Sequence, residues 1–526
     1  MPVFFIVTQE RSMRNMLNHY APSKSFINQD VYRDKVLGCW TGKNIGGTLG
    51  APMEGQREIF DISFYTQDLQ GNPAPNDDLD LQLVWLKAIE ENGIFNINER
   101  VLGEYWLGYI TGPWNEYGVG KFNMRNGLLP PLSGYCNNDQ WKNSNGAWIR
   151  SEIWACLFPG EPDEVAPYAW YDSCVDHADD GIYAEVFTAV LESAAFIEND
   201  LRKLIDYGFA RIPADCRVAR SVKIVLDCYD NGEDWKTARN KVVEDSADLG
   251  WFQAPANVAF VIIGLLYGEG DFGKSICIAV NCGDDTDCTG ATCGAILGIM
   301  KGRSGIPQEW IEPIGETIVT ISFTTLRIEP PRTLSELTDR VIACKKIMDQ
   351  EDPTLLRLTD GETVIEDEMV RRLSDGDTAL YRLTHRSSCT LEFSLPFGML
   401  SVNYGTSPVT KPGDTQEITL MFEQSRHENS VVQMEWQLPE GWSFAEGPVH
   451  QIMGYYDSRI SLKVHLTAGE FASSMVHIPV IITLSERNYP TYITVPFQRE
   501  GTVEANWKDF AIRYFDRRCR ILQRTK

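Results

Sequence analysis

The sequence from position 281 to 288 reads Asn-Cys-Gly-Asp-Asp-Thr-Asp-Cys, and a stretch rich in small residues, Gly290–Gly298, follows it directly. Ionised aspartates this close together repel one another, so burying them at a helix start is costly unless a cation or backbone N–H groups compensate. Carboxylates accompanied by Thr or Asn oxygens are the ligands that Mg²⁺ prefers. The segment therefore predicts a metal site at the start of a helix.

A second acidic cluster, Pro-Asn-Asp-Asp-Leu-Asp at positions 75–80, precedes an apolar run from Leu81 to Ile89. Its competing interpretation is an ordinary helix start, with Asn76 or Asp77 near the N-cap and acidic residues in the first turn. More than half of the helical part separates the two clusters, so only tertiary folding can unite them. Together they predict a cage for one divalent ion or a pair.

A glycine-rich segment, Gly-Lys-Asn-Ile-Gly-Gly-Thr-Leu-Gly-Ala-Pro-Met-Glu, occupies positions 42–54. Each glycine in a helix costs about 1 kcal/mol relative to alanine, so four of them require a packing or ligand reason. The simplest reason is close approach of the backbone to another group. Glu54 ends the segment, and a mere surface acid is the alternative interpretation of this residue.

The hydrophobic period divides the chain into two domains. Apolar residues at spacings of three and four over residues 31–350 predict an all-α domain, after an N-terminal extension at 1–30. Strict alternation beyond Pro353 predicts an all-β, immunoglobulin-like sandwich over 355–505, followed by an amphipathic tail at 506–526. The clearest helical stripes and strands are Leu334/Leu337/Val341/Cys344/Met348, Val218/Val222/Val225/Leu226, Glu417–Phe422, Val432–Leu438, Arg459–Leu466 and Tyr492–Phe497.

The overall charge and the cysteines restrict partners and compartment. A formal net charge of −25 argues against nucleic acid and anionic membranes as partners. No apolar stretch approaches the roughly 20 residues of a membrane helix. The thirteen cysteines show no paired spacing, which favours a reducing cytoplasm. Cys282, Cys288 and Cys293 are interpreted as buried packing residues, because zinc sites usually show close Cys or His pairs.

In this order, the three segments resemble the ADP-ribosylglycohydrolase family, which includes dinitrogenase-reductase-activating glycohydrolases and J1 crystallins. The resemblance spans about Val31–Ile347. The family pattern G-D-x-x-G-x-x-x-E is matched by residues 46–54, its T-D-D-T cluster by residues 76–79, and its D-x-D-T cluster by residues 285–288. This resemblance implies a helical glycosidase domain that acts on ADP-ribosyl groups.

The resemblance also implies roles for individual residues. Glu54 is the counterpart of the catalytic acid. Two Mg²⁺ ions, with Mn²⁺ as an alternative, are expected at the clusters. Residues 144–150 are similar to a G-N-G-A-x-x-R segment that contacts substrate, and Asp176-His177 is similar to a T-H segment near the ligand; a purely structural His177 is an equal alternative. The expected metal-site residues are Asn76, Asp77, Asp78, Asp285, Asp287 and Cys288, and the expected substrate-binding residues are Asn145, Gly146 and His177.

Several positions depart from the family pattern. Gly47 stands for Asp, Asn76 and Leu79 stand for Thr, and Cys288 stands for Thr. Asn76 can still offer a carbonyl oxygen, whereas a thiol is a poor Mg²⁺ ligand.

Asp80 and Asp284 are extra acids that are expected to compensate for the altered metal ligands by supporting them from the surrounding layer. Two alternatives stay open: a hydrolase of another small glycoside or nucleoside, and a non-enzymatic, crystallin-like relative. The sequence gives no indication of oligomeric state or of the role of the β-domain.

Overall fold

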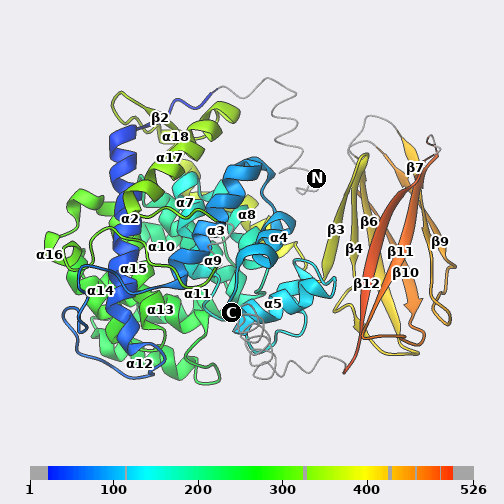
Figure 1. Cartoon of the computed structure of the whole chain (residues 1–526), viewed down its shortest axis with the longest axis horizontal. Coiled ribbons are helices and arrows are strands. Elements are labelled where there is room, and N and C mark those ends of the chain that lie inside the picture. Colours follow the sequence, from blue (N-terminus) through cyan, green and yellow to red (C-terminus); the bar gives the residue numbers. More distant parts are fainter. Residues whose placement is uncertain are drawn as a thin grey trace, which may run out of the picture.

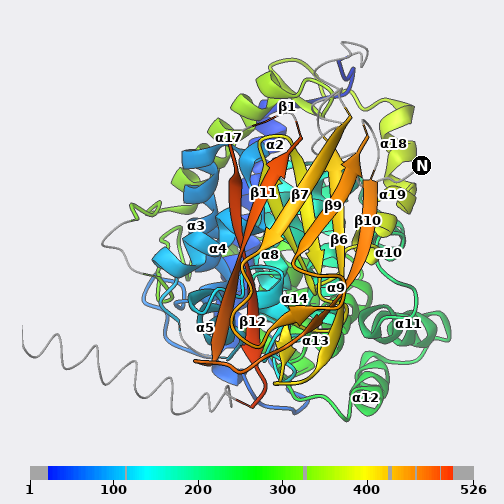
Figure 2. The same ribbon diagram turned by 90° about the vertical axis from the view of Figure 1, so that its right-hand side faces the viewer.

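The computed structural model describes residues 22–112, 115–323, 328–424, 429–455, 459–485, 487 and 489–501. It confirms the predicted fold class, a helical domain followed by an all-β domain. Figure 1 shows the two domains side by side, and Figure 2 shows the sandwich in front of the helices. The expected tail at 506–526 and most of the N-terminal extension lie outside the described residues.

The helical domain is assembled from helices that bury apolar faces in one core. The predicted stripe on the last long helix is confirmed, since four of its five residues are buried and Cys344 is half-buried. The helices are α2 (Gln29–Gly50), α3 (Asp77–Asn92), α4 (Glu99–Tyr109), α5 (Asn115–Arg125), α6 (Leu132–Tyr135), α7 (Glu152–Leu157), α8 (Pro162–Ser173), α9 (Asp180–Ala194), α10 (Leu201–Phe209), α11 (Arg217–Asp230), α12 (Trp235–Asp245), α13 (Ala254–Tyr267), α14 (Phe272–Asn281), α15 (Thr286–Lys301), α16 (Gln308–Ile311) and α17 (Leu334–Glu351), with short 3₁₀ turns η2 (Ala51–Met53), η3 (Ile94–Asn96), η4 (Trp148–Arg150) and η5 (Arg303–Gly305).

The antiparallel pair of α2 and α15 forms the centre of this domain (Figure 1). Glycines repeat every four residues along both helices and face one another at Gly38/Gly298, Gly42/Gly294 and Gly46/Gly290. A Cβ atom on Gly42 would lie 1.9 Å from the carbonyl oxygen of Gly294. The backbone approach expected from the sequence is therefore made to another helix. Because the two helices are antiparallel, the C-terminal end of α2 lies beside the N-terminal end of α15.

The segment after α17 differs from the expected domain arrangement. Residues 355–389 carry β2 (Arg357–Thr359), α18 (Asp367–Ser374) and α19 (Asp377–Thr384), and β2 pairs in parallel with β1 (Phe26–Asn28). Met369 and Leu373, one helical turn apart on α18, are buried in the helical core. The guanidinium of Arg211 donates hydrogen bonds to carbonyls at the end of α18. These contacts attach the segment to the helical domain, and the first sandwich strand begins at Thr390.

The β-domain is a sandwich of two five-stranded sheets, as predicted. One sheet has the order β3-β4-β6-β10-β8 and the other β5-β12-β11-β7-β9. The inward-facing residues of both sheets share one apolar core. The strands are β3 (Thr390–Leu395), β4 (Gly398–Asn403), β5 (Val409–Thr410), β6 (Thr415–Gln424), β7 (Ser430–Trp436), β8 (Ser443–Phe444), β9 (Val449–Gly454), β10 (Arg459–Thr467), β11 (Met475–Leu484) and β12 (Thr491–Arg499).

The sandwich is fixed to the helical domain near α5 and α6. Leu128, Leu132 and Cys136 of the helical domain belong to the apolar core of the sandwich. The side chain of Asn137 donates a 3.0 Å hydrogen bond to Oε1 of Gln498. The two domains thus share buried surface. Among the helices of the described ranges, none has the length and apolar character needed to cross a bilayer.

Candidate metal centre

Five acidic side chains from three separate segments converge at the end of the α2/α15 pair. Carboxylate oxygens of Glu54, Asp285 and Asp287 all lie within 4.8 Å of one another. A second group with the same spacing consists of Asp78, Asp287 and the Sγ atom of Cys288. Asp287 belongs to both groups, so the expected convergence of the two aspartate clusters is observed. Asp77 adjoins them at the start of α3.

Backbone hydrogen bonds join the segment around Glu54 to the segment around Asp285. The N–H of Gly55 donates to the carbonyl of Asp284 at 2.9 Å, and the N–H of Asp284 donates to the carbonyl of Gln56 at 2.9 Å. Glu54 follows the short turn η2, which ends the glycine-rich helix. These two hydrogen bonds therefore hold the segment after α2 beside the start of α15.

At the start of α3, Asn76 has the N-cap role that was the alternative to a metal ligand. Oδ1 of Asn76 accepts a 2.8 Å hydrogen bond from the N–H of Asp78, so Asn76 is the N-cap of α3. A Cβ atom on Gly47 would lie 2.3 Å from Nδ2 of Asn76. Asn76 thus fills the space that a side chain at position 47 would require.

Asp80 and Asp284 have partners in neighbouring loops, and their supporting role around the metals stays a prediction. Oδ2 of Asp80 accepts hydrogen bonds from the N–H groups of Ile321 and Ser322, at 2.5 and 2.6 Å. Asp284 adopts a left-handed backbone with φ of 63°, and its carboxylate pairs with Arg57 at 2.8 Å. Each of these two carboxylates thus has a partner in a neighbouring loop.

The cluster concentrates negative charge in a buried place. The carboxylate of Asp287, followed by burial and Asp77, raises the pKa of Glu54 to about 8. Burial, followed by Asp287, raises the pKa of Asp77 to about 6. Burial also raises the pKa of Asp78 and of Asp285 well above the ordinary value. In each case neutralisation by a nearby positive charge would favour the ionised carboxylate.

Two buried oxygens show that the donor set fits a cation. Oδ2 of Asp78 and Oδ1 of Asp287 have no hydrogen-bond partner, and their residues are 0% and 8% exposed. Buried polar atoms normally have partners, and an unpaired one calls for an explanation such as a bound ion or water. Carboxylate oxygens are ligands for Mg²⁺ and Mn²⁺. The residues present therefore fit the divalent ions that the sequence predicts.

Asn145 contacts the cluster, and Gly146 follows it in the chain. Nδ2 of Asn145 donates a 2.7 Å hydrogen bond to Oδ2 of Asp285, and Oδ1 of Asn145 accepts a 3.0 Å bond from the indole of Trp148. Both ends of this buried amide are thus engaged within the protein. A Cβ atom on Gly146 would lie 2.2 Å from Oε1 of Glu116, so this position requires glycine for close packing.

His177 lies in a buried polar network rather than on an open surface. Its Nε2 forms a 3.0 Å contact with Oγ of Ser144, and its Nδ1 lies 2.9 Å from Oδ1 of Asp176. Asp176 in turn pairs with Arg150 at 2.7 Å. Burial lowers the pKa of His177, so the ring is neutral near pH 7. These contacts favour the structural alternative for His177.

Two site residues were not predicted from the sequence. Lys43 of α2 is 1% exposed, and its Nζ lies 2.7 Å from Oε1 of Glu152 and 3.8 Å from Oδ2 of Asp78. Burial opposes this charge, but Glu152 and Asp78 raise the pKa of Lys43. The hydroxyl of Tyr117 donates a 3.2 Å hydrogen bond to Oδ2 of Asp77. For Lys43, the sequence signal that could have indicated a site residue was a lysine inside the glycine-rich apolar segment.

An aromatic trio of Trp141, Trp251 and Phe252 adjoins the loop after Glu54. The rings of Trp251 and Phe252 lie 5.2 Å apart, and those of Trp141 and Phe252 lie 6.0 Å apart. A Cβ atom on Gly55 would lie 3.7 Å from the ring of Trp251. All three rings are partly exposed. The trio therefore offers a partly open aromatic surface beside the carboxylates.

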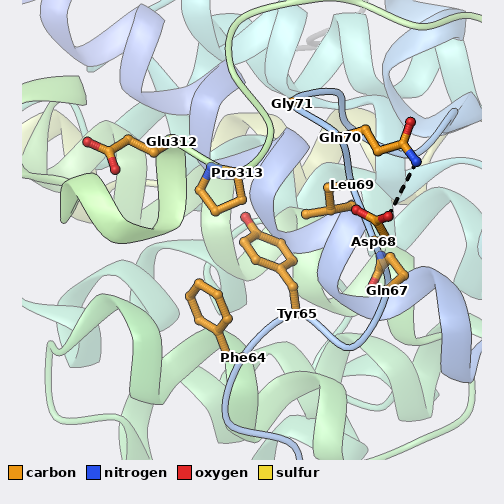
Figure 3. Close-up of a pocket in the computed structure, with 9 residues that line it drawn as sticks. All are labelled: Phe64, Tyr65, Gln67, Asp68, Leu69, Gln70, Gly71, Glu312 and Pro313. Atoms are coloured by element: carbon orange, nitrogen blue, oxygen red, sulfur yellow. Dashed lines mark hydrogen bonds between the residues drawn. The ribbon is translucent and has the colours of Figure 1, made fainter.

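A separate cavity of about 300 Å³ lies between the loop of residues 64–71 and Glu312-Pro313. Figure 3 shows Tyr65 and Leu69 facing this space, with Asp68 and Gln70 joined by a hydrogen bond on the loop. None of the carboxylates described above lines it. This cavity is therefore distinct from the metal centre.

Comparisons with known proteins place this site in a family. The profile described as ADP-ribosylglycohydrolase matches residues 28–346. The ADP-ribosylarginine hydrolase Tri1 of Pseudomonas putida (strain GB-1) is 37% identical over 49 residues, which are 9% of this chain and only 13% of that protein. A solved chain from an "ADP-ribosylglycohydrolase-related protein complex" aligns with 61% of this chain and 99% of its own length, at 17% identity and a TM-score of 0.40.

The family profile covers more than half of the sequence, and its span contains Glu54 and both aspartate clusters. The chain belongs to the ADP-ribosylglycohydrolase family.

Proposed function

We propose that this protein is a divalent-metal-dependent hydrolase that cleaves the glycosidic bond of an ADP-ribosyl group. The observation that carries the proposal is the approach of Glu54 to Asp285 and Asp287, with oxygens within 4.8 Å of one another. Cleavage at the anomeric carbon of a ribose develops oxocarbenium character, so the site must stabilise charge, position a water molecule and transfer a proton. The cluster contains side chains for each task.

In this proposal the aspartates hold the ions and Glu54 handles the proton. Asp77, Asp78, Asp285 and Asp287 would hold Mg²⁺ or Mn²⁺, with Asn76 and Cys288 beside them. The bound ions would supply positive charge where the ribose hydroxyls and the attacking water gather. Glu54 is the solvent-facing acid of the cluster, and it transfers a proton between the attacking water and the departing group.

The surroundings of the cluster support a nucleotide-containing substrate. The aromatic trio provides faces on which a purine can stack. The α3 and α15 helices both begin at the cluster, where bound divalent ions would supply the positive charge that attracts a pyrophosphate. This local positive potential is needed because the net charge of −25 repels phosphates elsewhere. Of the three residues expected at the substrate, Asn145 contacts the cluster directly, through its 2.7 Å hydrogen bond to Asp285.

A substrate panel tests the proposal. The full chain is incubated with Mg²⁺ and with ADP-ribose linked to arginine or serine side chains, a purine nucleoside and a simple glycoside, and products are separated by chromatography. Release of ADP-ribose that EDTA abolishes is the expected result. Cleavage of the nucleoside or glycoside alone would support the second candidate. Absence of turnover together with absence of ADP-ribose binding by calorimetry would indicate a non-enzymatic relative.

A further inference from the structure

The thiol of Cys288 lies inside the inner half of the metal centre. Cys288 is 5% exposed, follows Asp287 on the first turn of α15, and places its Sγ within 4.8 Å of carboxylate oxygens of Asp78 and Asp287. Its Sγ–H donates a 3.5 Å hydrogen bond to Oδ1 of Asp78. The thiol therefore faces an atom that the metal hypothesis assigns to the cation.

The two buried oxygens without partners point to a ligand at this place. Oδ2 of Asp78 and Oδ1 of Asp287 lack hydrogen bonds, and both residues contribute to the same group as Cys288. Lys43 is 3.8 Å from Oδ2 of Asp78 and is more closely engaged by Glu152, at 2.7 Å. The lysine thus leaves these oxygens without a close partner, as expected if a cation completes the group.

The two halves of the centre differ in chemistry. The outer group, Glu54 with Asp285 and Asp287, offers only oxygen, which suits Mg²⁺ or Mn²⁺. The inner group, Asp78 with Asp287 and Cys288, offers two carboxylates and one sulfur. Sulfur ligands select borderline or soft cations such as Zn²⁺, and three protein donors are the number typical of catalytic Zn²⁺ sites.

We infer that Cys288 is a metal ligand and that the inner position takes a thiophilic divalent cation of the zinc class, while the outer position takes Mg²⁺ or Mn²⁺. Binding forms a bond between Sγ and the cation, and the thiol proton is released to solvent. The inference deepens the proposed function, because it specifies the cofactors of the metal cage on which that function rests. The opposing interpretation is a buried thiol that only ties α15 to α3 through its bond to Asp78.

Cobalt substitution tests the inference without any enzymatic assay. Co²⁺ stands in for Zn²⁺, and a cobalt–thiolate bond gives an intense near-ultraviolet charge-transfer absorption that oxygen ligands do not give. The reduced, metal-free full chain is titrated with Co²⁺ and followed by absorption. A saturable charge-transfer band is expected in the wild type and in Cys293→Ser, which removes a buried thiol later on the same helix. The band should be lost in Cys288→Ser and Cys288→Thr.

Calorimetry with Zn²⁺ and Mg²⁺ gives the second measurement. Cys288→Thr should lower the affinity for Zn²⁺ relative to Mg²⁺ by roughly 10-fold or more, because loss of a sulfur ligand costs at least as much as loss of a group that only orients a ligand. A wild-type titration without the band, or an unchanged band in both Cys288 variants, would overturn the inference. Neither result bears on hydrolysis: the band can appear in a protein that cleaves no ADP-ribosyl bond, and an all-oxygen site can still cleave one.

Discussion

Nδ2 of Asn145 donates its 2.7 Å hydrogen bond to the same carboxylate, Asp285, that closes the outer half of the metal centre. This bond fixes the orientation of an otherwise repelled carboxylate. Asn145→Ala should therefore weaken Mg²⁺ binding roughly 10- to 100-fold in calorimetric titration, as expected when a group that orients a metal ligand is lost. Mg²⁺ affinity equal to that of the wild type would argue that Asp285 needs no orienting partner.

A matched control for this substitution is Asn138→Ala. Asn138 is also buried, and its amide donates to the carbonyls of Gly134 and Asp176 away from the metal centre. The control should lose a comparable amount of folding stability but retain the affinity for Mg²⁺. Equal loss of affinity in both variants would indicate a general effect of unfolding.

Glu54→Gln tests the proton-transfer role. The amide keeps the shape of the side chain but cannot exchange a proton, so hydrolysis should fall by roughly 10²- to 10⁴-fold while ADP-ribose still binds. Turnover is measured by release of ADP-ribose and binding by calorimetry. Glu58→Gln, an exposed acid on the same loop, should keep wild-type turnover. Full activity of Glu54→Gln would remove Glu54 from the chemistry.

Metal removal should make the folding stability dependent on pH in a defined direction. The pKa values of Asp77 and Glu54 are raised from 3.8 and 4.5 to about 6 and about 8 in the folded, metal-free protein. At these two groups the folded state then binds more protons than the unfolded state, so their contribution to the free energy of unfolding is largest below about pH 4 and is lost as the pH rises through 6 and 8.

Urea denaturation in EDTA across this range measures the effect. Excess Mg²⁺ should reduce the decline, because the cation favours the ionised carboxylates, and should add about 2.7 kcal/mol at about 100 times its Kd. A stability in EDTA that rises between pH 5 and 8 would contradict the account of the charge cluster.

Gly46→Ala tests the contact between α2 and α15. A Cβ atom at position 46 would lie 1.8 Å from the carbonyl oxygen of Gly290, so the two helices must separate. The variant should be destabilised, although alanine favours a helix by about 1 kcal/mol over glycine. Because separation also moves Glu54 away from Asp287, affinity for Mg²⁺ should fall. Thermal unfolding and calorimetry report the two effects.

Gly108→Ala is the control for the glycine substitution. Gly108 lies on the exposed side of α4, and a Cβ atom there meets nothing within 4 Å. This variant should unfold at the same or a slightly higher temperature than the wild type. If Gly46→Ala behaves in the same way, the helices are not held as closely as the structure shows.

The sequence predicted those features that depend on periodicity and local composition. Apolar spacing distinguished helices from strands, and the alternation at 459–466 marked β10. The glycines of positions 42–50 predicted a close backbone approach, but not its partner, because the matching glycines of α15 lie far away in the chain. The start of the sandwich was set too early, since the burial of Met369 and Leu373 against helices depends on tertiary contacts.

Individual side-chain directions in the centre could not be predicted. Asp284 and Asp285 are neighbours, yet the left-handed backbone at Asp284 turns its carboxylate to Arg57. Asp80 lies on the same first turns as Asp77 and Asp78 but faces the loop at Ile321. Lys43 was not predicted as a site residue, because Glu152, the partner that stabilises its charge, is distant in sequence.

The antiparallel pairing of α2 and α15 orders events during synthesis of the protein. Glu54 emerges from the ribosome long before Asp285 and Asp287, and the glycine faces of α2 have no complementary helix until α15 has been made. A nascent chain that ends before α15 therefore lacks the carboxylates of Asp285 and Asp287 and cannot bind a cation between them and Glu54. The proposed metal capture would therefore be a late step of maturation, available only to chains in which most of the helical domain has been translated.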